Sequence, residues 1–224
     1  MKFNYVLLLP IFIIFSACKS EKQAAQVDIQ QLEAAVNAAP DQAPLDSLLL
    51  AYQHYISTYP NDNEQITNYR NNAQNLLEKR LAYLKKITFN ESTGVLDQQA
   101  VREFIQLAEY YAVILPEAKQ TPDWLYQAAE LAGSLHEYGK TLTLFQMVNE
   151  RYPKYEKASQ VLFMRAFTLD SELKRFEEAR PLYQEFLQKY PNDDFADDAQ
   201  FLLDNLGKSE EEIIRAFQEK QAQQ

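Results

Sequence analysis

The dipeptide Tyr-Pro recurs at the ends of stretches with helical periodicity, and this recurrence restricts the fold more than any other feature of the chain. It occurs at Tyr59-Pro60, Tyr152-Pro153 and Tyr190-Pro191, and Leu115-Pro116 resembles an altered copy. Pro116 and Pro153 are 37 residues apart, and Pro153 and Pro191 are 38 apart. Proline cannot continue a helix, so each copy predicts a helix end. Internal periods of about 20–50 residues indicate a solenoid of stacked units.

Mostly apolar residues before the three Tyr-Pro dipeptides share one spacing. They fall at i, i+3, i+7, i+10 and i+14, which is a single face of a helix. The stripes are Leu45, Leu48, Tyr52, Tyr55 and Tyr59, then Tyr138, Thr141, Phe145, Val148 and Tyr152, then Phe176, Ala179, Tyr183, Phe186 and Tyr190. A further helix is expected upstream of each of the last two stripes, where the small residues Ala129 and Ala166 allow paired helices to approach closely.

These patterns predict an all-α chain of about five helix-turn-helix repeats. The repeats pair residues 29–39 with 45–59, about 64–87 with 98–115, 122–135 with 138–152, and 157–169 with 176–190, and a fifth begins near Asp194. A turn-rich linker over 88–95 lengthens the second repeat, and one added residue in the loop 170–174 accounts for the spacing of 38. Ser209 followed by Glu212 predicts a capping box for a last helix over 210–220.

The single cysteine, Cys18, directly follows an apolar segment. Lys2 precedes an apolar run from Tyr5 to Phe15, and two small residues, Ser16 and Ala17, stand before the cysteine. A charged start, an apolar run of about 7–15 residues and a small-residue cleavage site are typical of a secretory signal. The run is shorter than the ~20 residues of a transmembrane helix. We therefore expect a signal peptide over residues 1–17.

The residues Ser16-Ala17-Cys18 resemble the lipobox of bacterial lipoproteins, in which the cysteine thiol is lipidated and becomes the first residue of the mature chain. The resemblance implies a lipidated tether over 18–28, followed by the helical domain over 29–221. Because residue 19 is Lys rather than Asp, the resemblance further implies sorting to the outer membrane of a Gram-negative bacterium, on its periplasmic side. A structural cysteine, a disulfide and a catalytic thiol are the competing interpretations of Cys18.

Composition argues against several other classes of function. The chain has 22 basic and 32 acidic residues and a net charge of −10, which disfavours nucleic-acid binding. No phosphate-binding glycine motif, HExxH or GxSxG occurs, and the two histidines, His54 and His136, are far apart in sequence. The acidic runs near Asp193, Asp197 and Glu210 match helix starts, where carboxylates are favourable. We therefore predict no enzyme activity, no cofactor, no metal and no small-molecule substrate.

The helix pairs with small packing residues and a proline near the end resemble the tetratricopeptide repeat. The resemblance implies a right-handed solenoid, in which a short glycine turn would fall near Gly139. Together with Cys18, the whole chain resembles the BamD family of outer-membrane assembly lipoproteins. That resemblance implies a lipid-anchored, non-catalytic adaptor that docks other envelope proteins, among them a barrel-assembly component. The long second repeat and Leu115 in place of tyrosine depart from the family pattern.

Two other functions stay open at this point. One is a periplasmic coordinator of cell-wall or division factors of the CpoB type, whose members are usually soluble. The other is a nutrient-binding surface lipoprotein similar to the SusD-like binders, which are much longer. The single tryptophan, Trp124, fits either a binding surface or packing between repeats, and packing is the simpler interpretation.

Overall fold

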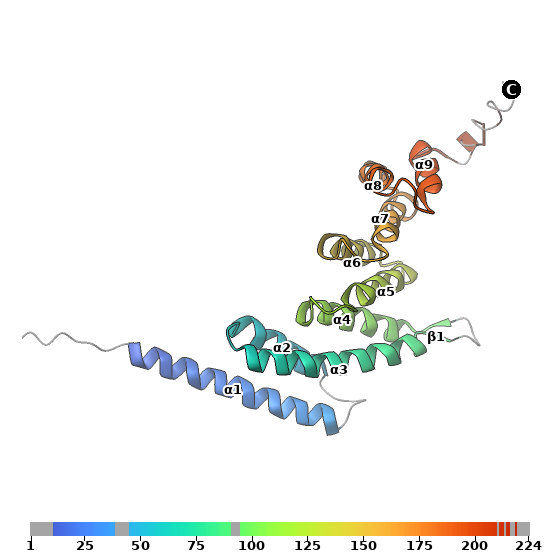
Figure 1. Ribbon diagram of the computed structural model, residues 1–224. Helices are drawn as coiled ribbons and strands as arrows, with labels where there is room; N and C mark the ends of the chain where they lie inside the picture. The colour runs from blue at the N-terminus through green and yellow to red at the C-terminus, as the bar shows by residue number, and fades with distance from the viewer. Residues whose placement is uncertain are drawn as a thin grey trace, which may run out of the picture. The chain divides into compact units, whose positions relative to one another are not determined.

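The computed structural model of the protein describes residues 11–38, 45–90, 95–209, 211–212, 214–215 and 218. The described chain is mostly helical, which confirms the predicted all-α class apart from one short hairpin. In chain order the elements are α1 (Ile11–Ala38), α2 (Leu45–Thr58), α3 (Asn63–Ile87), β1 (Phe89–Asn90), β2 (Val95–Leu96), α4 (Gln98–Ile114), α5 (Thr121–Ser134), α6 (Tyr138–Arg151), α7 (Ala158–Phe167), the π-helical turn η1 (Thr168–Glu172), α8 (Phe176–Lys189) and α9 (Ala196–Asp204), and Figure 1 labels most of them.

The chain divides into two compact units. The first comprises residues up to Glu78 together with Val113–Leu115, and the second comprises Lys79–Ala112 and the chain from Pro116 onward. Helices α3 and α4 therefore contribute residues to both units.

The core of the first unit is rich in tyrosine. Tyr52 and Tyr55 of α2 are fully buried and contact Tyr69 of α3, with ring centroids 4.9 and 5.0 Å apart. Leu48 of α2 and Ile29 of α1 also belong to this core, at 0% and 1% exposure. Burying the aliphatic side chains Leu48 and Ile29 contributes about 1.5–3 kcal/mol each relative to leaving them in water. The predicted apolar stripe of α2 is thus confirmed at its three central positions.

The segment expected as a tether, residues 18–28, lies within α1. Lys22 Nζ forms an ion pair with Asp62 Oδ2 at 2.6 Å, and Gln26 Nε2 donates to the Tyr55 hydroxyl at 3.0 Å. The sequence predicted that the packed part of the chain begins at residue 29, but in the structure it begins further upstream. The polar composition of 19–28 suggested a solvated linker, but long-range polar contacts hold it against the turn after α2. The side chain of Cys18 lies outside the described residues.

The linker expected over 88–95 contains a small hairpin. Strands β1 and β2 pair antiparallel, with Phe89 opposite Leu96 and Asn90 opposite Val95, while residues 91–94 lie outside the described chain. Asp97 then begins α4, because its Oδ1 accepts hydrogen bonds from the backbone N–H groups of Gln99 and Ala100, both at 3.0 Å. This is the N-cap arrangement that satisfies the first free donors of a helix.

In the second unit, consecutive helices pack in chain order, α5 on α6, α6 on α7, α7 on α8 and α8 on α9 (Figure 1). The central residues of the two predicted stripes are buried, as the helical spacing required. Ala129 and Ala166 are each 0% exposed, which confirms their expected positions between paired helices. The residues buried along the stripes are Thr141, Phe145, Val148, Ala179, Tyr183 and Phe186.

All three Tyr-Pro dipeptides end their helices with the same hydrogen bonds. The tyrosine N–H donates to the carbonyl four residues earlier, at 2.8–2.9 Å, in Tyr59, Tyr152 and Tyr190. Each tyrosine carbonyl then accepts from the N–H three residues later, at 3.0, 2.9 and 3.2 Å respectively. Tyr152 and Tyr190 share a ψ of 56° and 55°, outside the helical region that proline disfavours for its predecessor. The sequence repeat is therefore also a repeat of backbone geometry.

The expected glycine turn near Gly139 is wrong. Gly139 lies inside α6, and the turn before it is made by His136, whose φ is 59°. The N–H of His136 donates to Gly133 O and that of Glu137 to Ala132 O, both at 2.9 Å, which is the Schellman pattern of a helix end. These bonds hold a histidine in the left-handed conformation that glycine adopts more readily.

The extra residue of the next repeat is absorbed in η1 rather than in a loop over 170–174. Here the N–H of Leu173 donates to Thr168 O at 3.1 Å, a π-helical bond over five residues. The closing bond runs from Arg175 N–H to Leu169 O, six residues back, whereas its counterpart at Glu137 spans five. Lys174, with φ of 54°, takes the place of His136.

The capping box predicted at Ser209 is confirmed. The backbone N–H of Ser209 donates to Glu212 Oε2 at 2.8 Å, and the N–H of Glu212 donates to Ser209 Oγ at 3.2 Å. Of the following residues, 211–212, 214–215 and 218 are described, and they are helical. Within the described chain, no helix combines the length and apolarity needed to cross a membrane.

Candidate functional site

The residues considered for chemistry in the sequence lie on different elements of the chain. His54 is exposed on α2, and His136 lies in the turn before α6, with its Nδ1 2.7 Å from the Tyr138 hydroxyl. Asp197 and Asp198 fall in the first turn of α9, as expected of carboxylates at a helix start. In the described ranges, no group of three or more His, Cys, Asp or Glu side chains is arranged to hold a metal ion.

Trp124 lies in the packing between α4 and α5. Its ring contacts Phe104 and Tyr111, with centroids 6.0 and 6.4 Å apart. Its indole Nε1 is buried and has no hydrogen-bond partner in the described chain. The ring therefore serves packing between consecutive helix pairs, which confirms the simpler of the two interpretations.

Two neighbouring hollows lie in the second unit, and we call them together the turn-side groove. The first hollow has a volume of about 670 Å³ and lies between the α4–α5 and α6–α7 connections. The second, of about 660 Å³, lies between α6, α7 and α8, and Pro153 lines both. The groove thus follows the side of the unit on which the Tyr152-Pro153 and Tyr190-Pro191 turns lie.

Two tyrosines of the turn after α6 build the first hollow. The Tyr152 hydroxyl donates to Pro116 O at 2.9 Å, which joins this Tyr-Pro turn to the altered copy one repeat earlier. The Tyr155 hydroxyl donates to Asp123 Oδ1 at 2.6 Å, near the start of α5. Burial and the nearby Asp123 carboxylate raise the pKa of Tyr155, so this hydroxyl remains protonated. The hollow therefore has a fixed wall of polar groups.

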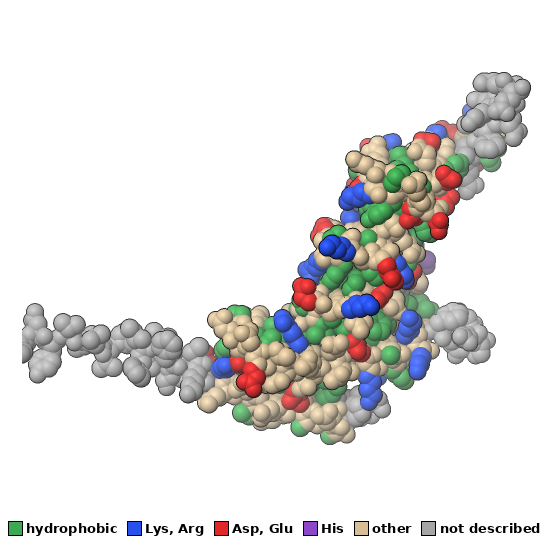
Figure 2. Space-filling view, viewed as in Figure 1, with side chains coloured by type: hydrophobic (Ala, Val, Ile, Leu, Met, Phe, Trp, Pro, Cys, Tyr) green, Lys and Arg blue, Asp and Glu red, His purple; other side chains and the backbone are tan. Residues whose placement is uncertain are grey.

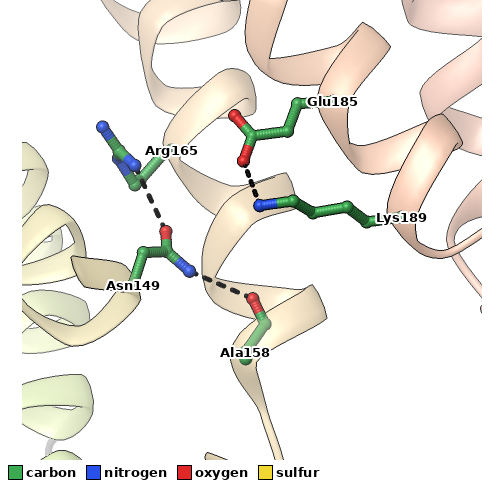
Figure 3. A network of polar contacts seen from close by, with 5 residues as sticks. All are labelled: Asn149, Ala158, Arg165, Glu185 and Lys189. Carbon is green, nitrogen blue, oxygen red and sulfur yellow. Dashed lines mark hydrogen bonds and ion pairs between the residues drawn. The ribbon is translucent and has the colours of Figure 1, made fainter. Parts of the chain in front are cut away.

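The second hollow contains a half-buried arginine on α7 (Figure 3). Arg165 Nη1 donates to Asn149 Oδ1 at 3.3 Å, and Asn149 Nδ2 donates in turn to Ala158 O at 3.2 Å. Beside them on α8, Lys189 Nζ lies 2.6 Å from Glu185 Oε1. Of the ion pairs formed within the described ranges, none includes Arg165.

The surroundings of Arg165 shift its pKa without removing its charge. Burial lowers the pKa of the Arg165 guanidinium, and the carboxylates of Glu150 and Glu185 partly oppose this effect. Even with this lowering, an arginine side chain stays charged in proteins. A half-buried cation held by one amide is open to further hydrogen bonding, so this hollow can accept a polar or anionic group from another chain.

The turn-side groove is balanced in charge although the chain as a whole is acidic. The first hollow is lined by three acidic and three basic residues, and the second by two of each, namely Glu150 and Glu185 with Arg165 and Lys189. The acidic residues of the first hollow are Glu117, Asp123 and Glu156. The basic residues of the first hollow are Lys119, Arg151 and Lys154. Figure 2 shows acidic and basic side chains interspersed with apolar ones on the visible face of this unit. Such a surface suits a polypeptide segment better than a polyanion.

Neither Arg165 nor Tyr155 was predicted from the sequence as a residue of this groove. One signal was available for Arg165, because it interrupts the otherwise apolar run Val161–Phe167 on a helix with a buried face. For Tyr155 no local pattern indicated that its hydroxyl would reach Asp123, which is 32 residues away. Both positions depend on the packing of consecutive helix pairs.

In comparisons with known proteins, the chain matches no family model and no curated protein sequence.

Proposed function

We propose that this protein is a lipid-anchored, non-catalytic adaptor of the machinery that assembles outer-membrane proteins. In this proposal its helix pairs form a right-handed solenoid of tetratricopeptide-like repeats, and the turn-side groove docks a polypeptide segment of a barrel-assembly partner. The single observation that carries the proposal is the recurrence of the Tyr-Pro turn with one hydrogen-bond pattern at Tyr59, Tyr152 and Tyr190. Stacked repeats of this kind present extended surfaces that bind other chains.

The proposed anchor is a lipid on Cys18. It is supported by the apolar run up to Phe15 and by the small residues Ser16 and Ala17 before the cysteine. Acyl chains contribute about 0.8 kcal/mol per buried CH₂, and stable anchoring requires more than one chain, which a triacylated cysteine provides. Lys22 and Gln26 of α1, which make polar contacts with the rest of the first unit, both follow Cys18, so cleavage before Cys18 would leave these contacts in place.

Labelling tests the anchor directly. Cells grown with radioactive palmitate should label the wild type and the control Ala24→Ser, which makes the same new residue at an exposed position of α1. Cys18→Ser should lose both the label and sedimentation with outer membranes. Equal labelling of Cys18→Ser and wild type would refute lipidation at this residue.

The proposed docking role is supported by the turn-side groove. Its two hollows share Pro153, carry balanced charge and are lined by both apolar and polar residues. These are properties of protein interfaces, in which a few buried polar anchors are surrounded by mixed contacts.

The partner is tested by gentle crosslinking of the tagged full-length protein in its native membranes, followed by pull-down and mass spectrometry. We expect a barrel-assembly protein to be recovered from the wild type and to be depleted severalfold when Arg165 is replaced by methionine. The control, Arg175→Met, changes an exposed arginine outside the groove. Recovery of cell-wall enzymes or of a nutrient-import barrel instead would refute the assembly role and favour one of the other two functions.

A further inference from the structure

The segment directly after Cys18 is fixed to the turn that follows α2. Lys22 Nζ lies 2.6 Å from Asp62 Oδ2, and this same oxygen accepts the Tyr55 hydroxyl at 2.5 Å. Gln26 Nε2 donates to the Tyr55 oxygen at 3.0 Å, so two successive turns of α1 are tied to one hydroxyl–carboxylate pair. The hydrogen bond from Lys22 is the largest cause of the lowered pKa of Asp62, which therefore stays ionised at neutral pH.

This network places residue 18 close to the Tyr59–Asp62 turn. A helix rises about 1.5 Å per residue, so Cys18 lies roughly 6 Å along α1 from Lys22. A flexible tether of about ten residues would instead spread its ends over roughly 16–19 Å r.m.s.. Because α1 is helical through this segment, Cys18 is held at a fixed place relative to the turn.

The hollow at this turn is lined by residues with no net charge. Lys22 and Asp62 neutralise each other, and the other lining residues of the hollow at the turn are uncharged. They are Thr58, Tyr59, Pro60 and Asn61. Pro60 and Asn61 are exposed, and tyrosine is enriched at the interface between a bilayer and water. This composition fits the headgroup region of a membrane.

We propose that the Tyr59–Asp62 turn is a membrane-contact surface, against which the lipid on Cys18 holds the bilayer. The inference rests on the proposed lipidation of Cys18, and it adds that a helix fixed to the first unit, rather than a flexible linker, joins the lipid to the domain. The partner of this surface is the lipid headgroup layer. The turn thereby fixes which end of the first unit faces the membrane.

A distance measurement tests, without any lipid, whether Cys18 is held at a fixed place relative to the Tyr59–Asp62 turn. The full chain, produced without export and kept in mild detergent, would carry nitroxide labels on Cys18 and on Asn61→Cys. We expect a narrow distribution centred below about 20 Å, because the labels lie near opposite sides of the Lys22–Asp62 pair. Adding Asp62→Asn should at least double the width of the distribution, whereas the control Asp46→Asn, at an exposed position of α2, should not change it. A broad distribution in the parent would overturn the proposal.

A depth measurement then tests the membrane contact. In the lipidated protein the thiol of Cys18 is acylated, so a fluorophore reacts with an introduced cysteine instead. In vesicles with headgroup nitroxides, label at Asn61→Cys should be quenched at least threefold more than label at Ala35→Cys, which lies roughly 25 Å along α1 from Cys18. Equal quenching would overturn the membrane contact. If the distribution of distances is narrow but the protein dissociates from the vesicles, the lipid anchor itself would be refuted.

Discussion

Enlarging a small residue between paired helices tests the packing at the centre of the second unit. Ala166 of α7 is 0% exposed and belongs to the same buried cluster as Ala179, Tyr183 and Phe186 of α8. Ala166→Leu adds three carbon atoms where no accessible space exists. Forcing extra methylenes into a packed core costs about 1–3 kcal/mol, because neighbouring side chains and backbone must shift. For a chain of this size, that corresponds to a melting temperature roughly 2–12 °C lower.

The assay is thermal and urea unfolding followed by circular dichroism at 222 nm. Ala129→Leu, at the equivalent place in the preceding helix pair, should behave in the same way, because Ala129 is also 0% exposed. Gln184→Leu is the matched control, since it introduces the same side chain at an exposed position of α8. If Ala166→Leu and Ala129→Leu melt with the control, these alanines do not lie where helices meet, and the assignment of the repeats is wrong.

Three further predictions concern single polar groups. Tyr152→Phe removes the hydrogen bond from the tyrosine hydroxyl to Pro116 O and should lower the free energy of unfolding in urea by about 0.5–1.5 kcal/mol. Tyr59→Phe should be near neutral, because the Tyr59 hydroxyl has no partner in the described chain, and equal losses of unfolding free energy in both variants would contradict the role of the bond. Burial raises the pKa of Asp170, so the ionised carboxylate destabilises the fold above that pKa. Asp170→Asn should therefore raise the melting temperature at pH 7 but not at pH 3, and a lower melting temperature at pH 7 would argue against a destabilising carboxylate. The pKa of Asp62 is lowered, so its ion pair with Lys22 stabilises the fold by about 0.2–1 kcal/mol above about pH 4, and this stabilisation is lost as the pH falls through the lowered pKa. The difference in unfolding free energy between wild type and Asp62→Asn, measured in urea, should therefore vanish in acid. A difference that stays constant with pH would exclude the ion pair as its source.

The sequence was sufficient to place most helices because two strong local signals agree. The Tyr-Pro dipeptides ended the predicted helices 138–152 and 176–190, and the structure ends α6 at Arg151 and α8 at Lys189. The fixed spacing of the stripes identified Phe145 and Tyr183 as buried, since helical geometry alone brings such positions onto one face. Proline chemistry and hydrophobic periodicity are both readable without knowledge of the tertiary structure.

Features that depend on long-range contacts could not be read in this way. The polar residues 19–28 look like a solvated linker in isolation, and only the positions of Tyr55 and Asp62 show why they are helical and attached. His136 takes the left-handed turn conformation expected of a glycine because the helix end supplies two backbone hydrogen bonds. Similarly, Arg165 becomes a groove residue only when Asn149 of α6 packs beside it.

Site-specific photocrosslinking in living cells tests the adaptor proposal most directly. A photoreactive residue at Lys154, an exposed position of the turn-side groove, would be compared with one at Gln184, an exposed position of α8 outside the groove. We expect Lys154 to crosslink to a barrel-assembly protein in the outer membrane, and Gln184 to give at most a tenth of that product. Equal crosslinking from both positions, or a product from Lys154 that contains only soluble cell-wall enzymes, would refute docking of a barrel-assembly partner in the turn-side groove.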